Sequence, residues 1–165
     1  LWAKRLFAAA GCAYVIFLGA LTIRENRHWH DELALYDRIL QKSPDSARTI
    51  YNQGKVYEER GDIQKALERF DRAIELSSGG KAMYYNSRGM LHKNLGNREK
   101  ARADFEAAVR QAPNVAIYHN NLGCVYAELG RIDDARREWQ AALAIDPRDE
   151  LSRRNLEVAG RGGRP

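Results

Sequence analysis

Residues 121–130, N-L-G-C-V-Y-A-E-L-G, place Gly123 inside a stretch whose flanks favour helix. A glycine within a helix costs on the order of 1 kcal/mol relative to alanine, so its presence needs a physical reason. The residue recurs upstream, because Gly89 lies 34 residues before Gly123 and Gly54 lies 35 residues before Gly89. Recurrence at this period predicts a tandem array of supersecondary units.

Other small and aromatic residues recur with these glycines. Each glycine is followed at fixed distances by an alanine, an aromatic residue and a second alanine: Ala66, Phe70 and Ala73; Ala101, Phe105 and Ala108; Ala135, Trp139 and Ala142. Small residues let helices cross closely while aromatic rings fill the space beside them, so we expect Gly123 to be a contact glycine. A second glycine set, Gly61, Gly96 and Gly130, is expected to end the first helix of each unit and turn the chain.

The recurring set N-x-G-x-V-Y, L-G, A-x3-aromatic-x2-A and a closing proline resembles the tetratricopeptide repeat family. The resemblance implies an all-α, right-handed superhelical solenoid of helix pairs, with three units over residues 47–149, namely 47–81, 82–115 and 116–149. Residues 27–46 are interpreted as a half-repeat junction, because Tyr36 lies 34 residues before Phe70. We expect a capping helix over 150–159 and a flexible tail over 160–165.

The chain begins with an apolar segment, since residues 6–23 contain no charged side chain. At about 1.5 Å per residue a helix of this length spans roughly 27 Å, close to the roughly 30 Å core of a bilayer. The segment predicts a transmembrane anchor over residues 1–26, in which the spanning residues include Leu6, Phe7, Val15, Ile16, Phe17, Leu18, Leu21 and Ile23. A cleaved signal peptide, lipid attachment at Cys12, and a helix buried against a protein partner remain alternatives.

The residues that follow this segment, R-x-x-R-x-W-x-D-E-x-x-L at 24–35, show a second, weaker resemblance. With residues 20–48 they are similar to the last membrane helix and repeat tail of bacterial multi-pass glycosyltransferase-like proteins. That resemblance implies an extracytoplasmic, periplasmic repeat domain, and an alternative role as the regulatory tail of such a protein. Basic residues flank both sides of the apolar segment equally, so charge alone does not orient it.

Charge and motif content exclude several function classes. The net charge of +5 comes from the two ends of the chain, and residues 25–147 are balanced, which argues against a nucleic-acid-binding stripe. Cys12 and Cys124 have no metal-spaced partners, and there is no nucleophile elbow or phosphate loop. We therefore expect neither a cofactor nor catalysis.

The resemblance implies a protein partner held along the concave face, which the first helix of each unit lines. Carried over by position, this groove comprises Arg48, Tyr51, Asn52, Lys55, Met83, Asn86, Met90, Asn120, Asn121 and Cys124. Asn52 and Asn121 match the family's groove asparagine, whose amide can donate to and accept from a peptide backbone. The same amides could instead satisfy neighbouring groups of the chain itself.

Members that clamp a chaperone's C-terminal carboxylate use lysine, asparagine and arginine at set groove positions. These positions here hold Tyr51, Lys55, Ser87, Ile117 and Asn121, so most of the clamp is absent. The partner is expected to be a partly hydrophobic helix or peptide, such as a subunit of a membrane complex. Arg88 and His92 occupy positions that normally face the interior of a helix pair, where they need a partner or a displaced helix. Pairing with an acid such as Asp104, an outward-reaching side chain, and contact with a bound protein remain alternatives.

Overall fold

The computed structural model describes residues 32–78 and 81–160, and the chain divides into two compact units, residues 1–44 and 45–165. The predicted anchor helix over residues 1–26 lies outside the described ranges, as does the tail beyond Gly160. Within those ranges no helix combines the length and apolar character that crossing a bilayer requires. In the first unit, residues 32–42 of the predicted junction are helical, and Tyr36 Oη donates a hydrogen bond to Glu32 Oε1 at 3.1 Å.

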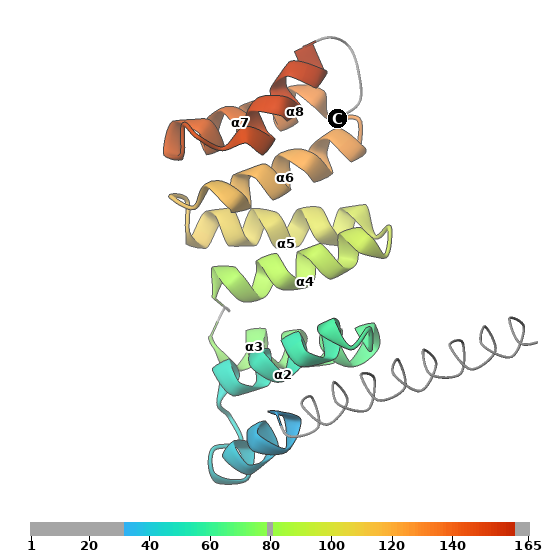
Figure 1. Cartoon of the computed structure of the whole chain (residues 1–165), viewed down its shortest axis with the longest axis vertical. Coiled ribbons are helices and arrows are strands. Elements are labelled where there is room, and N and C mark those ends of the chain that lie inside the picture. The colour runs from blue at the N-terminus through green and yellow to red at the C-terminus, as the bar shows by residue number, and fades with distance from the viewer. Residues whose placement is uncertain (1–31, 79–80, 161–165) are drawn as a thin grey trace, which may run out of the picture. The chain divides into compact units, whose positions relative to one another are not determined.

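Between Asp45 and Gly160 the second unit is built from consecutive helices that lie one after another in a stack (Figure 1). They are α2 (Ala47–Glu59), α3 (Ile63–Leu76), α4 (Ala82–Asn94), α5 (Arg98–Gln111), α6 (Ala116–Glu128), α7 (Ile132–Ile145) and α8 (Glu150–Gly160). No described residue is in a strand, so the expected all-α class is confirmed.

The helices pack in pairs, α2 with α3, α4 with α5 and α6 with α7, and each pair packs on the next. We call α2, α4 and α6 the first helices of their pairs. The second helix of each pair contacts the following first helix, and α8 takes the place of a further first helix after α7. An array of this kind has no single central core, because each pair covers the apolar side of its neighbour.

The leading glycines are required by close packing inside each pair. A Cβ atom at Gly123 would lie 2.6 Å from Trp139, and one at Gly54 would lie 2.7 Å from Phe70. Gly89 makes the same approach to Phe105, and the three rings are fully buried. The prediction that Gly123 is a contact glycine is confirmed.

The second glycine set is required by backbone conformation. Gly61, Gly96 and Gly130 have φ of +77°, +75° and +77°, a region that L residues other than glycine rarely adopt. A Cβ at any of them would meet nothing within 4 Å, so space is not the reason for glycine. They end α2, α4 and α6, as predicted.

Candidate functional site

The first helices are joined to one another by a series of side-chain hydrogen bonds, which we call the polar ladder. The hydroxyls of Tyr51 and Ser87 lie 2.9 Å apart, and Asn121 Nδ2 donates to Asn86 Oδ1 at 2.9 Å. The last contact joins α6 to α8, where Asn155 Nδ2 donates to Asn120 Oδ1 at 3.4 Å. The ladder was not anticipated, although polar residues 35 or 36 positions apart in the repeats were a signal that could have revealed it.

The ladder distinguishes the two asparagines predicted to hold a peptide. Asn121 uses one amide proton on Asn86, so part of its hydrogen-bonding capacity serves the solenoid itself. Asn52 occupies the corresponding position in α2 and is half-buried, and its side-chain amide makes no hydrogen bond to another described residue. Of these two amides, the one at Asn52 keeps its full capacity for a ligand.

The C-terminal end of the predicted groove is covered by α8. Asn120 is only 5% exposed and accepts a hydrogen bond from Ser152 Oγ at 3.0 Å. Cys124 Sγ lies 3.4 Å from Asn155 Nδ2, and burial raises the pKa of the Cys124 thiol. Placing Asn120 on an open groove was therefore wrong, because the capping helix continues the stack over it.

Within residues 45–78 and 81–160, no helix covers the N-terminal end of the face. We call its members the open half: Arg48, Asn52, Lys55, Met83, Asn86 and Met90. Arg48 is exposed, the Met83 side chain is 44% exposed, and the remaining four are half-buried. Lys55 is paired with Glu58 on its own helix, so its charge is already balanced. Ile117 on α6, at 47% exposed, extends the apolar surface beside the open half.

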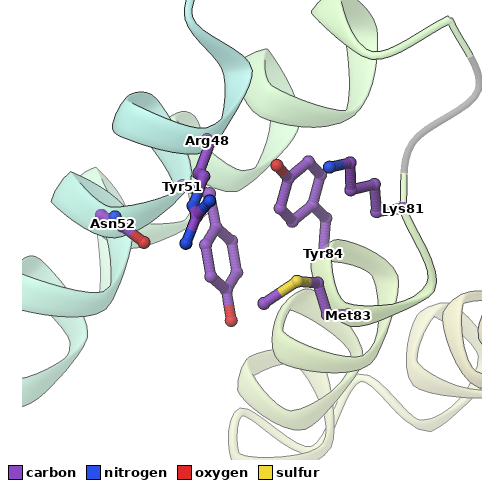
Figure 2. A pocket seen from close by; sticks show the side chains of 6 residues that line it. All are labelled: Arg48, Tyr51, Asn52, Lys81, Met83 and Tyr84. Atoms are coloured by element: carbon purple, nitrogen blue, oxygen red, sulfur yellow. The ribbon is translucent and has the colours of Figure 1, made fainter.

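A pocket of about 180 Å³ lies between α2 and the start of α4. Figure 2 shows its lining: Arg48, Tyr51, Asn52, Lys81, Met83 and Tyr84. Tyr51 was predicted as a groove contact, but it is only 8% exposed and stacks on Tyr84 with ring centroids 4.6 Å apart. Tyr51 therefore forms a wall of the pocket, whereas the cations stand at the rim.

Arg88 has its partner within the chain. Its guanidinium donates to both carboxylate oxygens of buried Asp104, from Nη2 at 2.6 Å and from Nε at 3.0 Å, and Nη1 lies 2.6 Å from Asp71. Of the alternatives left open by the sequence, pairing with an acid is the one observed, and no external protein is needed to neutralise Arg88. Beside it, burial lowers the pKa of His92, whose Nδ1 is buried and has no hydrogen-bond partner in the described part of the chain.

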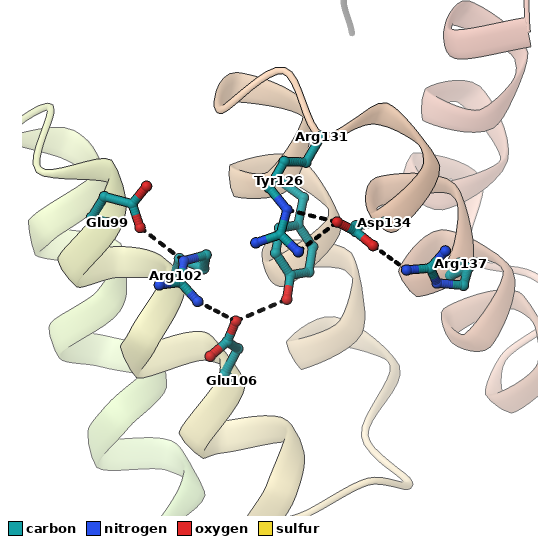
Figure 3. A network of polar contacts seen from close by, with 7 residues as sticks. All are labelled: Glu99, Arg102, Glu106, Tyr126, Arg131, Asp134 and Arg137. Atoms are coloured by element: carbon teal, nitrogen blue, oxygen red, sulfur yellow. Dashed lines mark hydrogen bonds and ion pairs between the residues drawn. The ribbon is translucent and has the colours of Figure 1, made fainter.

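Another set of charges links α5, α6 and α7 (Figure 3). Tyr126 Oη donates to Glu106 at 2.8 Å, and Glu106 also pairs with Arg102 at 2.6 Å. Burial, and then the hydrogen bond to Glu106, raise the pKa of Tyr126 to about 12. Arg131 lies over the Tyr126 ring and pairs with Asp134. These contacts join neighbouring repeats. Because the charges also neutralise one another, the network leaves little net charge with which to attract a ligand.

Two tetratricopeptide repeat models match residues 47–79 and 86–150, which together exceed half of the chain. The chain belongs to the tetratricopeptide repeat family. It is 33% identical over 84 residues to tetratricopeptide repeat protein 36 of Mus musculus, covering 49% of this chain and 45% of that protein. It is 31% identical over 101 residues to the mitochondrial import receptor subunit TOM70 of Rattus norvegicus, covering 60% of this chain and 16% of that protein. The chain thus spans less than half the length of these curated relatives.

Solved structures share the fold at lower identity. A crystal structure of MamA superposes with a TM-score of 0.74 at 21% identity, covering 84% of this chain and 75% of that one. YrrB, described as a tetratricopeptide repeat protein with an unusual peptide-binding site, gives 0.72 at 21% identity and covers 82% and 70%. The first repeat domain of Spaghetti (RPAP3), bound to an HSP90 peptide, gives 0.67 at 15% identity and covers 70% and 91%. These likenesses show the solenoid fold alone.

Neither repeat model extends into residues 20–46, on which most of the resemblance to glycosyltransferase-like repeat tails depends. Residues 20–31 also lie outside the described ranges. Across residues 32–78 and 81–160, no cluster of three or more His, Cys, Asp and Glu side chains could hold a metal ion.

Proposed function

We propose that this tetratricopeptide repeat chain is a membrane-anchored scaffold that binds a polypeptide partner on the open half of its first-helix face. The observation that carries the proposal is the contrast along that face. The α6 end is covered by α8, while α2 and α4 present an exposed cation at Arg48, an exposed thioether at Met83 and the uncommitted amide of Asn52. No catalytic step is part of this function.

The chemistry of the open half suits a polypeptide. A side-chain amide can both donate to and accept from a peptide backbone, which makes Asn52 a suitable contact for an extended segment. Methionine is flexible and polarisable, so Met83 and Met90 can adapt to apolar side chains of differing shape. The neighbours described with a peptide site or a bound peptide share only the fold, and the residues of this chain therefore carry the assignment.

The membrane anchor is proposed from residues 6–23, whose uncharged length suits a bilayer core and whose ends are basic. The partner is accordingly a subunit of a membrane complex, and the resemblance over residues 20–48 favours an extracytoplasmic position for the repeats. The test is fractionation of the full chain: it should stay with membranes through washes in high salt and alkaline carbonate and be released by detergent. Release by salt alone contradicts the anchor.

Partner binding is tested by photocrosslinking within the native membrane. A photoreactive phenylalanine analogue at Met90 lies on the open half, and the matched control carries it at Gln140, an exposed position on α7. We expect a discrete adduct from Met90 that disappears in Asn52→Ala/Met83→Ala protein, and no adduct of that mass from Gln140. The same adduct from both positions would contradict a groove-specific partner.

The alternative role, a regulatory tail of a multi-pass glycosyltransferase-like protein, is favoured only by the motif at residues 24–35. It requires further membrane spans in the gene product upstream of Leu1. Sequencing the complete transcript separates the two roles, because a single-span product excludes the multi-pass alternative.

A further inference from the structure

We infer that the pocket between α2 and α4 anchors an acidic side chain of the partner that stands next to an apolar residue. The inference rests on the proposed function, because it names the chemistry of the polypeptide that the open half would bind. Three features of the pocket support it: its unbalanced positive charge, its aromatic wall and its small volume.

The charge of the pocket is positive and uncompensated. Arg48 and Lys81 stand at its rim, both are exposed, and neither forms an ion pair with another described residue. Among the residues that the structure describes, no aspartate or glutamate lines the pocket. The cations of the α5–α7 network differ, since Arg102 and Arg131 are each paired with carboxylates. A surface that holds two cations without a local acid is complementary to an acidic partner.

The interior of the pocket is apolar. The rings of Tyr51 and Tyr84 are stacked at an interplanar angle of 30°, and the thioether of Met83 borders them (Figure 2). The volume of the pocket is about 180 Å³. Small-molecule sites typically measure about 300–1,000 Å³. The pocket therefore matches one or two side chains of a peptide better than a whole metabolite.

The structure favours an internal acidic residue over a free C-terminal carboxylate. Tyr51 and Ser87 occupy two positions at which related proteins clamp such a carboxylate, and here both side chains are buried and bonded to each other. Ile117, at a third position, offers no donor. Arg48 and Lys81 lie instead on the rim, where a glutamate or aspartate side chain can reach them while its apolar neighbour enters between Tyr84 and Met83.

The test uses the full chain in detergent micelles and three pools of synthetic nonapeptides with random flanks. One pool has a fixed Glu-Leu-Glu centre and an amidated C-terminus, one has Gln-Leu-Gln with the same amide, and one has Gln-Leu-Gln with a free carboxylate. We expect the acidic pool to bind about tenfold tighter than either neutral pool at 50 mM NaCl. Binding should weaken as salt rises to 500 mM, because exposed charges are screened.

Variants assign the effect to the pocket. Arg48→Glu/Lys81→Glu should lose at least about tenfold in affinity for the acidic pool, since two attractive contacts become repulsive. The matched control, Arg148→Glu/Arg154→Glu, makes the same change of net charge at two exposed arginines outside the pocket, and it should bind like the unmodified chain. Circular dichroism and thermal unfolding confirm that both variants are folded.

Equal binding of acidic and neutral amidated pools, absence of binding to the acidic pool, or an equal loss in both double variants would each overturn the inference. Preference for the free-carboxylate pool would overturn it in favour of a C-terminal ligand. The proposed function is tested separately by the Met90 adduct in membranes. An adduct that persists in Arg48→Glu/Lys81→Glu protein would support the scaffold role and contradict the acidic anchor.

Discussion

Asn120 and Asn52 lie on first helices at opposite ends of the same face, yet their surroundings differ. Asn120 accepts hydrogen bonds from Ser152 and Asn155 and is almost fully buried beneath α8. The Asn52 side-chain amide makes no hydrogen bond to another described residue and borders the pocket between α2 and α4. Asn120 stands at the repeat position of Tyr51, one residue before that of Asn52, so repeat position contributes to its burial, and α8 adds the hydrogen bonds that commit its side chain. In the proposed function, the α6 end is structural and the open half contacts the partner.

The largest expected effect is a loss of unfolding free energy when a buried aromatic ring is removed. We expect the same loss at the α2 and α6 ends of the solenoid, because the ring packs inside a helix pair at both. Phe70 and Trp139 are each fully buried against a leading glycine. Replacement of either by alanine should lower the free energy of unfolding by about 4 kcal/mol, the typical cost of removing a buried aromatic side chain. Urea denaturation followed by circular dichroism measures it. If only Trp139→Ala lowered the free energy of unfolding, the two ends would differ in their internal packing as well as in whether a further helix covers them.

Removing an asparagine side chain should lower stability at the α6 end of the solenoid but not at the α2 end. Asn120→Ala removes the acceptor that Ser152 and Asn155 share at a covered site, while Ser152 Oγ keeps Asp149 and Asn155 Nδ2 keeps Cys124 Sγ. We therefore expect a loss of about 1 kcal/mol of unfolding free energy, the typical net value of a hydrogen bond. Asn52→Ala should change the unfolding free energy by less than about 0.5 kcal/mol, because the Asn52 side chain has no described hydrogen-bond partner. Equal losses measured by urea denaturation would mean that the open end carries structural hydrogen bonds as well.

Thiol labelling tests the cover directly. In a Cys12→Ser background, Met83→Cys/Cys124→Ser protein should react with iodoacetamide at least tenfold faster than protein that retains Cys124. Met83 is exposed, whereas Cys124 is partly covered by α8 and burial raises the pKa of its thiol above the ordinary 9.0. The alkylation rate of Cys124 should consequently still be rising above pH 9, because the thiolate is the reacting form. Comparable alkylation rates for the two thiols at neutral pH would contradict a difference in accessibility between the two ends.

The smallest expected effect concerns His92, between the two ends. Burial, followed by the charges of Arg88 and Lys100, lowers the pKa of His92, while Asp104 and Asp71 oppose the shift. The unfolded chain then binds the proton more readily, so the contribution of His92 to stability falls as pH drops through about 6.5. His92→Tyr places there the residue found at Tyr57 and Tyr126 and should lose less stability between pH 7 and pH 5. Identical pH profiles in thermal unfolding would contradict this.

The repeat units and the roles of their glycines could be predicted because steric packing and positive φ leave a residue-type signature at a fixed period. The cover over Asn120 could not, since it depends on how Ser152 and Asn155 of a short terminal helix reach across to α6. The basic pocket was also missed. Lys81 lies outside the groove positions of the family and meets Arg48 only when α2 and α4 are stacked. The sequence indicated that Arg88 could pair with an acid, because a buried guanidinium requires one, but it could not identify that acid as Asp104.

Hydrogen–deuterium exchange of the full chain, with and without a peptide selected from the acidic pool, tests the central claim most directly. The account predicts that the peptide slows exchange in residues 47–59 and 82–94, the helices of the open half, and leaves residues 150–160 unchanged. Slower exchange confined to residues 116–128 and 150–160 would contradict it, because the peptide would then bind at the end that α8 covers.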